Sequence, residues 1–517
     1  MNVRPLLGLA GVLLSVMASD LNDQVTGVSL PDMRGSLGIG LDAGTWIESL
    51  YLSAQPLGMA VSAWFMVTLT LRRWALAVIA LIAATSILLP FSPNVGAFYA
   101  LRILQGLAGG LMTPLLMDTA LFVLGPPIRL YGLAAYALTA TFVPAMAPTV
   151  SAFWSDVVQW KFAFYQSLPL CALGALLVWY GLPPEKPKYG RFKQFDWRAV
   201  VLIVVGIGSL TTMLYQGDRL DWFNSRTICV LALISAVGIP LLLVNEWFHP
   251  LPFIKLQMLG RRNFAYGVVG LFSFIVIAQA SGPLPLRFLT EVDGLRPLQA
   301  QTVTLVIAAS QLLLLPLMAP LLDRRSVDSR VVSVVGLGLM AAACLGCASV
   351  TVYWNREQFY FWQGLQSVGQ SMVVMSLLMM ATNTVKSEEE APFASAGINF
   401  PRSVAEVVGP WLLDVIEHRR GHFHSDRIVD QVGLDRWRLI QGPGVLPQHP
   451  PPLRSDGIPR VPGSLSGFAE SVKQQVEILT TSDAYLIFGI LTLVVIGIVL
   501  ILPVRTLPPR ILLAGKR

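Results

Sequence analysis

Charged residues are scarce in this chain of 517 residues, in which Asp, Glu, Lys and Arg together make up only 13%. Soluble globular proteins carry about 25%. With 54% hydrophobic residues and a mean hydropathy of +0.63, the composition excludes an ordinary soluble globular protein. Apolar runs of about 20 residues recur along the chain, which is typical of a helical protein that crosses a bilayer many times.

Cysteine is also rare, and four residues exclude a disulfide scaffold. Cys344 and Cys347 form a CxxC pair, but a zinc site needs two further ligands and none lie nearby in the sequence. The run His418–His424 holds three histidines among arginines, and we interpret it as a solvated charge cluster. We therefore expect no metal and no cofactor.

Motifs of ATP-driven pumps and of common enzymes are missing as well. The chain has no GxxxxGK[ST] loop, so we do not expect it to hydrolyse ATP. Motifs of hydrolases, kinases and dehydrogenases are likewise absent, and we expect a protein that is not an enzyme. The net charge of +7 is carried in short loops, which indicates membrane orientation and argues against nucleic acid as a partner.

The apolar runs predict an all-α, polytopic fold with about fourteen membrane spans. We interpret the N-terminal run as an uncleaved first span, because polar residues follow it directly. The approximate bounds of the spans are 6–30, 46–69, 74–91, 97–124, 130–154, 162–182, 199–214, 228–247, 264–289, 303–322, 331–350, 359–384, 393–416 and 484–504.

A linker rich in Pro, Lys and Arg, PPEKPKYGRFKQFDWR at 183–198, separates the first six spans from the others. The expected divisions are an N-terminal six-helix bundle at 1–182, the cytoplasmic linker at 183–198, two inserted helices with a loop at 199–263, C-terminal bundle helices at 264–416, a periplasmic loop at 417–482, and the last helix with a cytoplasmic tail at 483–517.

Basic residues are concentrated in alternate loops, which predicts the orientation of the chain. With the N-terminus inside, the inner loops carry Arg72, Arg73 and the linker cluster, whereas outer connections such as Phe91–Asn94 carry no cation. An even number of spans places both termini in the cytoplasm. The polar segment 417–482 is then expected outside, as an extended loop.

Arg102 and Gln105 lie near the start of an apolar run, Leu101–Pro114, that otherwise suits the middle of a bilayer. A charge there costs at least about 2.5–3.5 kcal/mol on insertion scales, so an intramembrane arginine indicates a functional site. Small residues in the run, including Gly106 and Gly110, let neighbouring helices approach closely enough to shield the arginine.

Proton coupling needs carboxylates whose pKa changes with conformation, next to a basic partner. Asp20 and Asp23 lie three residues apart in the first span and so on one side of the helix. Glu406 follows Arg402 by one turn in the thirteenth span, where the two side chains are expected to pair. We name these three acids and Arg102 as candidate proton-coupling residues, and which first-span aspartate titrates is open. Other acids are expected at the membrane–water interface, namely Glu48, Asp118, and Glu291 paired with Arg287.

Three glutamines, Gln363, Gln366 and Gln370, fall roughly on one face of the twelfth span, which is also rich in methionine. Adaptable and sparsely polar walls of this kind suit amphiphilic molecules. Together with Gln105, the three residues are candidates for lining a substrate cavity. The alternative is a methionine-rich helix core without a ligand.

Several strings resemble motifs of a known family. Arg102–Gly106 resembles the RxxQG motif of major facilitator transporters, in which the arginine is linked to proton transfer, and Asn22–Pro31 resembles their LDxTIVNVALP motif with the aspartate shifted by one position. Gly206–Leu210 and Gly217–Phe223 are similar to the seventh-span region of the fourteen-span, EmrB-type drug/proton antiporters. The resemblance implies two pseudo-symmetric six-helix bundles, two inserted helices and a cavity near the midplane.

Two motifs of that family are altered here. The loop motif GxLaDRxGrR is replaced by AWFMVTLTLRR at Ala63–Arg73, so we expect gating from its second-half counterpart, Asp323 with Arg324. The antiporter motif of the fifth span reads PAMAPTVSA from Pro144, with Ala and Ser in place of Gly. Pro148 can still kink that helix.

The resemblance implies a proton-coupled exporter of small amphiphilic compounds, of the multidrug type, embedded in the lipid of a bacterial inner membrane. It also implies a periplasmic adaptor protein and an outer-membrane channel as partners in a Gram-negative cell. Two other interpretations stay open. One is an exporter of a single metabolite, such as a siderophore, fatty acid or pigment, and the other is a non-transporting membrane sensor or scaffold.

Overall fold

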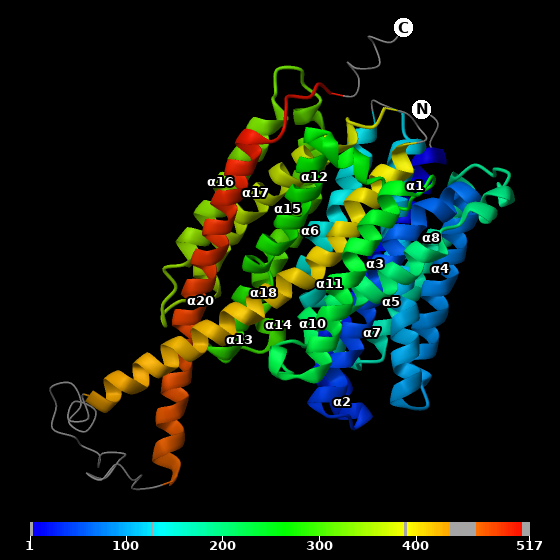
Figure 1. The fold of residues 1–517 in the computed structure, drawn as a ribbon. Coiled ribbons are helices and arrows are strands. Elements are labelled where there is room, and N and C mark those ends of the chain that lie inside the picture. The colour runs from blue at the N-terminus through cyan, green and yellow to red at the C-terminus, as the bar shows by residue number, and fades with distance from the viewer. Residues whose placement is uncertain (1–3, 126–127, 387–389, 435–461, 509–517) are drawn as a thin grey trace.

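The computed structural model describes residues 4–125, 128–386, 390–434 and 462–508, which are helical and contain no β-strand (Figure 1). The first half comprises α1 (Arg4–Val28), α2 (Leu30–Leu37), α3 (Leu41–Leu69), α4 (Leu71–Leu88), α5 (Val95–Phe122), α6 (Arg129–Phe153), α7 (Phe162–Tyr165) and α8 (Ser167–Gly181). The inserted helices are α9 (Trp197–Leu202), continued by a π-helical turn into α10 (Gly208–Gln216), and α11 (Arg226–Phe248). The second half comprises α12 (Arg262–Ile277), α13 (Pro283–Glu291), α14 (Pro297–Ala300), α15 (Thr302–Leu322), α16 (Ser329–Cys347), α17 (Arg356–Thr382), α18 (Ala391–Leu434) and α20 (Pro462–Ile501).

Thirteen helices in the described residues are long and apolar enough to cross a membrane. The helix α18 is not among them, because Asn399, Arg402 and Glu406 interrupt its apolar sequence. It nevertheless runs through the bundle, packed against α3, α5 and α12 (Figure 1). The all-α polytopic fold is therefore as predicted, and α18, whose sequence is interrupted by polar residues, is packed against other helices.

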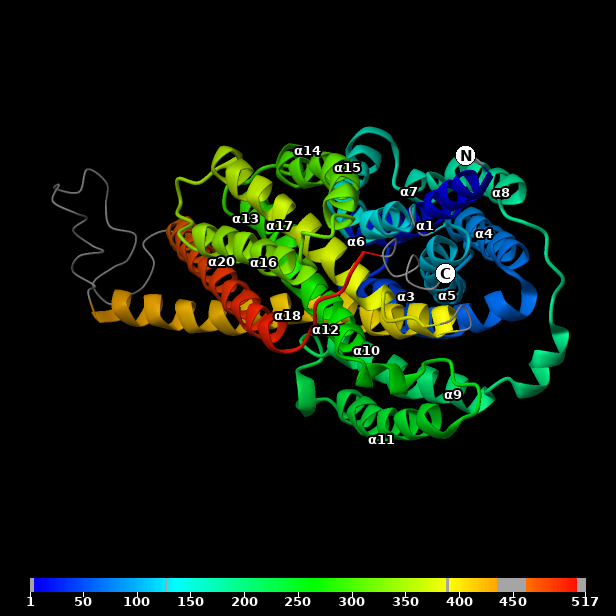
Figure 2. The same ribbon diagram turned by 90° about the horizontal axis from the view of Figure 1, so that it is seen from above.

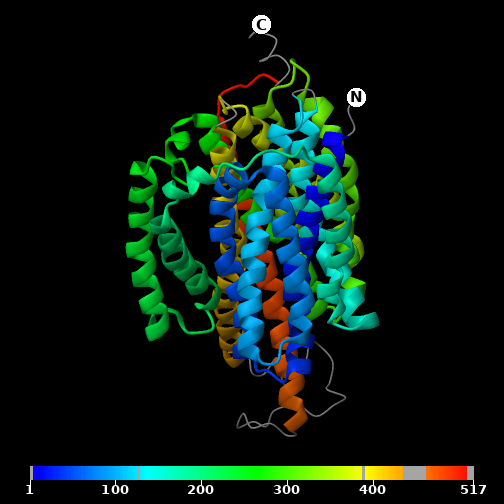
Figure 3. The same ribbon diagram turned by 90° about the vertical axis from the view of Figure 1, so that its right-hand side faces the viewer.

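The inserted helices lie on one side of the molecule. Seen from above, α9, α10 and α11 form a separate layer beside α3 and α18, and the view from the side shows them in green at the edge (Figures 2 and 3). The start of α1 and the end of α20 lie at the same end of the bundle (Figure 1). We call this end, marked by Arg4 and Ile501, the terminal end.

The polar segment expected as an extended loop at 417–482 is instead helical in its described parts, so that prediction was wrong. Helix α18 continues through the histidine-rich run to Leu434, and α20 begins at Pro462; residues 435–461 lie outside the described residues. Asp483 of α20 accepts a hydrogen bond from Arg420 of α18 at 2.6 Å and lies 2.7 Å from His424 Nε2. One carboxylate thus joins the two helices and orders the run that the sequence analysis interpreted as solvated.

Glycines bring α3 and α5 into backbone contact. A Cβ atom at Gly106 would overlap the carbonyl oxygen of Tyr51, and one at Gly110 would overlap that of Gln55. Arg102 lies one turn before Gly106 and is 0% exposed. The prediction that small residues allow neighbouring helices to shield this arginine is confirmed.

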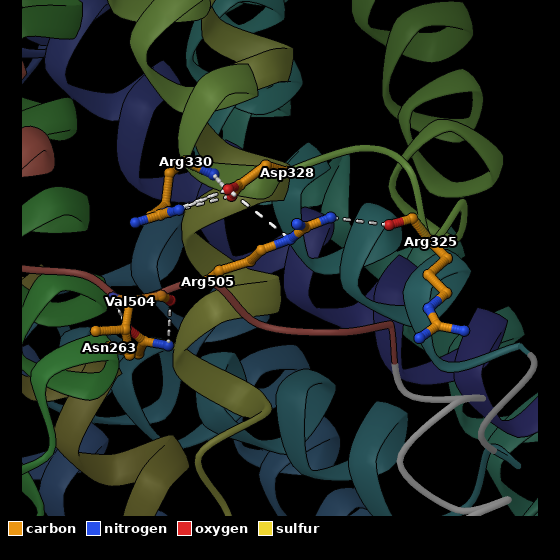
Figure 4. A network of polar contacts seen from close by, with 6 residues as sticks. All are labelled: Asn263, Arg325, Asp328, Arg330, Val504 and Arg505. Carbon is orange, nitrogen blue, oxygen red and sulfur yellow. Dashed lines mark hydrogen bonds and ion pairs between the residues drawn. The ribbon is translucent and has the colours of Figure 1, made fainter.

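The C-terminal segment is tied to the second half at the terminal end (Figure 4). The side-chain amide of Asn263 donates to the carbonyl oxygen of Val504 at 2.9 Å, and its oxygen accepts from the N–H of Val504 at 2.6 Å. Arg505 lies 3.9 Å from Asp328, which also accepts a hydrogen bond from Arg330 at 2.7 Å. The hydrogen bonds from Arg330 hold the pKa of Asp328 below its ordinary value.

A second polar link at the terminal end joins the loop after α11 to the start of α18. The guanidinium of Arg261 donates to both carboxylate oxygens of Glu390, at 2.8 and 2.9 Å, and Lys255 lies 3.8 Å away. The bonds from Arg261 lower the pKa of Glu390 from its ordinary value of 4.5 to about 2. A depressed folded-state pKa means that this link stabilises the fold above about pH 4.5 and is lost as the pH falls towards 2.

Replacing Gly106 with Ala is expected to lower the free energy of unfolding by about 1–3 kcal/mol, the usual range for overpacking. The added methyl group would push α5 away from the Tyr51 carbonyl. Thermal unfolding in detergent measures the effect. Gly338→Ala in α16 is the matched control, because a Cβ there meets nothing within 4 Å. Equal stability of the two variants would contradict the close packing.

Replacing Glu390 with Gln is expected to destabilise the protein at pH 7 by about 1.5–3 kcal/mol, the range for hydrogen bonds to charged groups. The difference from the unsubstituted protein should shrink as the pH falls from 4.5 towards 2, since the carboxylate then becomes neutral in both states. Thermal unfolding measured against pH tests this. The control is Glu185→Gln, because the carboxylate of Glu185 forms no ion pair within the described residues. If the stability difference between Glu390→Gln and the unsubstituted protein did not change with pH, the role assigned to the Glu390 carboxylate would be contradicted.

Candidate functional site

Two arginines lie buried among the helices, Arg102 on α5 and Arg402 on α18, with exposed fractions of 0% and 3%. One belongs to the first half of the molecule and the other to the second. A guanidinium inside a bilayer needs charged and hydrogen-bonding partners, because no water is there to solvate it. The partners of the two arginines define the candidate site.

Arg102 is surrounded by groups from three helices. Its Nη1 donates to Gln105 Oε1 at 2.7 Å, and its Nε donates to the carbonyl oxygen of Ile47 at 3.2 Å. The guanidinium lies over the ring of Tyr51, 4.4 Å from its centroid. Its Nη2 lies 3.7 Å from Asp23 Oδ1. At this distance the two groups attract each other electrostatically but form no hydrogen bond. The guanidinium is therefore hydrogen-bonded within α5 and to α3, and the carboxylate of Asp23 lies beside it without a hydrogen bond to it.

Arg402 has the same kinds of partner. Its Nε donates to Glu406 Oε1 at 2.9 Å, so the predicted pair one helical turn apart is confirmed. Its Nη1 donates to Thr139 Oγ1 at 3.0 Å, and its guanidinium lies 5.5 Å from the ring centroid of Tyr136. Its Nη2 lies 3.9 Å from Asp20 Oδ2. Three of these four partners belong to the first half, so Arg402 joins the two halves.

The aspartates of α1 face different arginines. They lie on one side of the helix, as their spacing predicts, but Asp23 approaches Arg102 of the first half while Asp20 approaches Arg402 of the second half. The hydroxyl of Tyr136 adds a further link between the halves, since it donates to Asn399 Oδ1 at 2.7 Å. The carboxylates of α1 therefore lie between two buried positive charges, one from each half.

Glu48 and Tyr215 also belong to this polar region. The hydroxyl of Tyr215, on the inserted helix α10, donates a hydrogen bond to Glu48 on α3. Helix α3 begins at Leu41, earlier than the predicted span start at 46, which places Glu48 two turns inside the helix. No sequence pattern links the pair, because the contact depends on how α10 docks against α3.

Asp118, which was expected at the membrane–water interface, lies one turn before the end of α5 and is 0% exposed, buried between helices. The start of α18 covers this part of α5, and Ser395 donates to the carbonyl oxygen of Pro114 at 3.1 Å. The predicted pair of Arg287 with Glu291 is wrong. The guanidinium of Arg287 instead contacts two acids of α18, Asp414 at 2.9 Å and Glu417.

The glutamines of α17 are buried on one face, as predicted, and gather around a break between α12 and α13. Gln363 donates to the carbonyl oxygen of Ser281 at 3.1 Å, and Gln370 donates to its hydroxyl at 2.8 Å. The amide of Gln366 finds no hydrogen-bond partner among the described residues. Gln105 bonds Arg102 in the other half. No described hydrogen bond brings the four glutamines together.

The residues named for gating lie where the halves meet or where helices end. Pro144 and Pro148 lie inside α6, which continues to Phe153. Thr149, the residue after Pro148, forms a hydrogen bond with Gln301 at the start of α15. Asp323 caps the C-terminal end of α15, followed by Arg324. Farther along this loop, Asp328 contacts Arg330 and Arg505, and no motif in the sequence indicated this contact (Figure 4).

Known proteins resemble this chain over most of its length. The Major Facilitator Superfamily profile matches residues 12–284. The fatty acid resistance protein FarB of Neisseria gonorrhoeae is 27% identical over 504 residues, which cover 94% of each chain. The multidrug export protein EmrB of Escherichia coli (strain K12) is 25% identical over 451 residues, covering 83% of this chain and 84% of EmrB.

Solved structures share the fold. A POT family transporter in complex with a thioalcohol conjugated peptide has a TM-score of 0.58 at 12% identity, covering 95% of this chain and 96% of that one. The human organic anion transporter MFSD10 has a TM-score of 0.54 at 15% identity, covering 94% and 99%. The profile match spans more than half of the chain, and the helical architecture agrees with it. The chain therefore belongs to the Major Facilitator Superfamily and is a multi-pass membrane transporter.

Proposed function

We propose that this protein exports small amphiphilic compounds in exchange for protons. The observation that supports this most directly is the contact between Asp20 and Arg402, in which an acid of the first half lies 3.9 Å from a buried arginine of the second half. The likeness to EmrB, a multidrug export protein, supports export. We further propose that the protein lies in a bacterial inner membrane with both termini in the cytoplasm.

Asp20 is the acid that couples the proton to movement of the halves. When it is ionised, attraction to Arg402 favours the arrangement in which the halves touch here, and the attraction is strong because the surroundings exclude water. A proton on Asp20 removes the attraction and favours an arrangement in which the halves separate at this level. Since the two arrangements bind the proton with different affinity, a proton gradient can drive the change between them.

Asp23, Arg102 and Glu406 complete the proton-coupling set. Asp23 lies one turn from Asp20 and beside Arg102, so it exchanges protons within the first half. Glu406 keeps the charge of Arg402 compensated when Asp20 is neutral, because its hydrogen bond lies within α18 and does not depend on the distance between the halves. Gln105 orients Arg102 through the bond at 2.7 Å.

Substrate binding is assigned to the glutamines. Gln363, Gln366 and Gln370 present amides in an apolar, methionine-rich surrounding, and the unpartnered amide of Gln366 is available to a polar group of a substrate. Gln105 would contact the substrate from the first half. Gating is assigned to Pro144 and Pro148 of α6 and to Asp323 with Arg324 after α15. A periplasmic adaptor protein and an outer-membrane channel are proposed partners, as the resemblance to EmrB-type exporters implies.

A second candidate substrate class is a single kind of amphiphile, the fatty acids. The observation that favours it is the likeness to FarB, a fatty acid resistance protein, over 94% of both chains. Proton flux into proteoliposomes, elicited in turn by a hydrophobic cationic dye and by a long-chain fatty acid, separates the two. Flux with both indicates multidrug export, and flux with the fatty acid alone indicates the dedicated exporter. Flux with neither would support a non-transporting role.

Replacing Asp20 with Asn is expected to reduce substrate-induced proton flux by about 5- to 150-fold, the range of typical coupling free energies. The amide keeps the shape of the side chain and loses the titratable charge. Substrate binding, measured by fluorescence quenching, should persist because Asp20 is not assigned to the cavity wall. Asp430→Asn, an exposed position on the extension of α18, is the control. Unchanged flux in Asp20→Asn would refute the coupling role.

A further inference from the structure

A cavity of about 1160 Å³ opens at the terminal end, away from the buried arginines. Its walls come from the start of α1, the junction of α3 and α4, the ends of α5 and α8, and the first residues of α18. Residues 181–191, leading into the linker, and 251–253, after α11, close it from the side. None of the residues assigned to coupling, gating or substrate binding lines it.

The lining of this cavity is strongly cationic. Its cations are Arg4, Arg72, Lys186, Lys188 and Arg191, against a single acid, Glu185. None of these cations forms an ion pair in the part of the chain that the structure describes. Burial lowers the pKa of Arg191, which shows that its charge is partly removed from water without a compensating carboxylate. Unpaired cations around a cavity attract an anion.

Buried hydrogen-bond donors without acceptors point to the same kind of ligand. Trp64 and Thr70 line the cavity and are 5% exposed, and neither Trp64 Nε1 nor Thr70 Oγ1 has a partner among the described residues. Arg191 is half-buried, and its Nε also lacks a partner there. An indole N–H and a guanidinium can only donate. Each buried donor left unpaired is unfavourable. A ligand with several acceptor oxygens would satisfy them.

The backbone holds part of this site in an unusual conformation. Thr70, between α3 and α4, has a φ of 83°. Positive φ is an outlier for a β-branched residue and needs support from its surroundings. Thr70 lies in the stretch Ala63–Arg73, which contains no carboxylate. A carboxylate there would repel an anion, so the altered sequence suits an anionic ligand.

Two aromatic residues that line the cavity are exposed at the surface of the protein. Trp179 and Tyr180, at the end of α8, are exposed, and both lie beneath cations of the site. The guanidinium of Arg72 is 4.2 Å from the ring centroid of Trp179, and that of Arg4 is 5.4 Å from the ring centroid of Tyr180. Trp and Tyr at the end of a spanning helix are typical of the headgroup level of a membrane. The exposed Phe122 adds apolar surface for a hydrocarbon chain.

We propose that this cavity binds the anionic headgroup of an acyl-chain amphiphile, with its oxygens on Arg72, Arg191 and Trp64 and its chain along Trp179. Basic pockets between membrane helices bind anionic lipid headgroups in this way. An anionic phospholipid and a free fatty acid share this chemistry. The bound molecule would join the linker to the α3–α4 junction, and the proposal does not depend on proton exchange.

The test uses the purified full chain in maltoside detergent, titrated separately with phosphatidylglycerol, oleate and phosphatidylcholine. Thermal unfolding and native mass spectrometry report binding, since a ligand of the folded state raises the unfolding temperature. We expect an increase and a retained molecule with phosphatidylglycerol, oleate or both, and neither with phosphatidylcholine. Binding of phosphatidylglycerol alone identifies the phospholipid, and binding of oleate alone identifies the fatty acid. The same response to all three would overturn the proposal.

The variant Arg72→Gln/Arg191→Gln is expected to weaken binding by roughly ten- to thirty-fold, since two cations near an anionic headgroup are removed. Lys193→Gln/Arg198→Gln is the matched control, because both residues are exposed cations of the linker that do not line the cavity. Trp64→Phe removes only the indole N–H and tests the site without a change of charge, should the double variant not fold. Equal affinity in the unsubstituted protein and the cavity variants, or equal loss in the control, would overturn the proposal.

Discussion

A guanidinium inside a bilayer must be compensated by the protein, and this constraint organises the helices around Arg102 and Arg402. Each arginine takes an aromatic ring, a neutral hydrogen-bond acceptor and a carboxylate of α1. The helix α1 must therefore pass close to both α5 and α18. Close approach of α3 and α5 through Gly106 and Gly110 completes the shield around Arg102.

The same constraint explains the position of α18. Its polar residues would be unfavourable against lipid, so other helices surround it, although its composition is the least apolar of the helices that run through the bundle. From this position its side chains reach α1 and α6 of the other half. The helix α18 is thus one of the places where the two halves contact each other, and the packing of α6 against α15 is another.

The charged residues at the terminal end differ from the buried arginines in their partners and in their access to solvent. The interior arginines lie 3.7 and 3.9 Å from carboxylates of α1 in surroundings that exclude water, where charges interact strongly. The cations around the cavity are unpaired and lie at the level expected for lipid headgroups, where an anion from the membrane or the substrate pool can reach them. We therefore propose that the protein separates a buried site for protons from a peripheral site for anionic amphiphiles.

The sequence by itself determined the features that depend on local spacing or composition. These are the all-α membrane fold, the burial of Arg102 in an apolar run, the common side of Asp20 and Asp23, and the pair of Arg402 with Glu406 one turn apart. Only the tertiary structure decided which arginine each aspartate of α1 faces, that Tyr215 bonds Glu48, and that Asp118 is enclosed. These contacts join residues far apart in the chain, and they exist only once helices dock. Helical periodicity specifies which face a side chain lies on, and packing specifies what lies opposite that face.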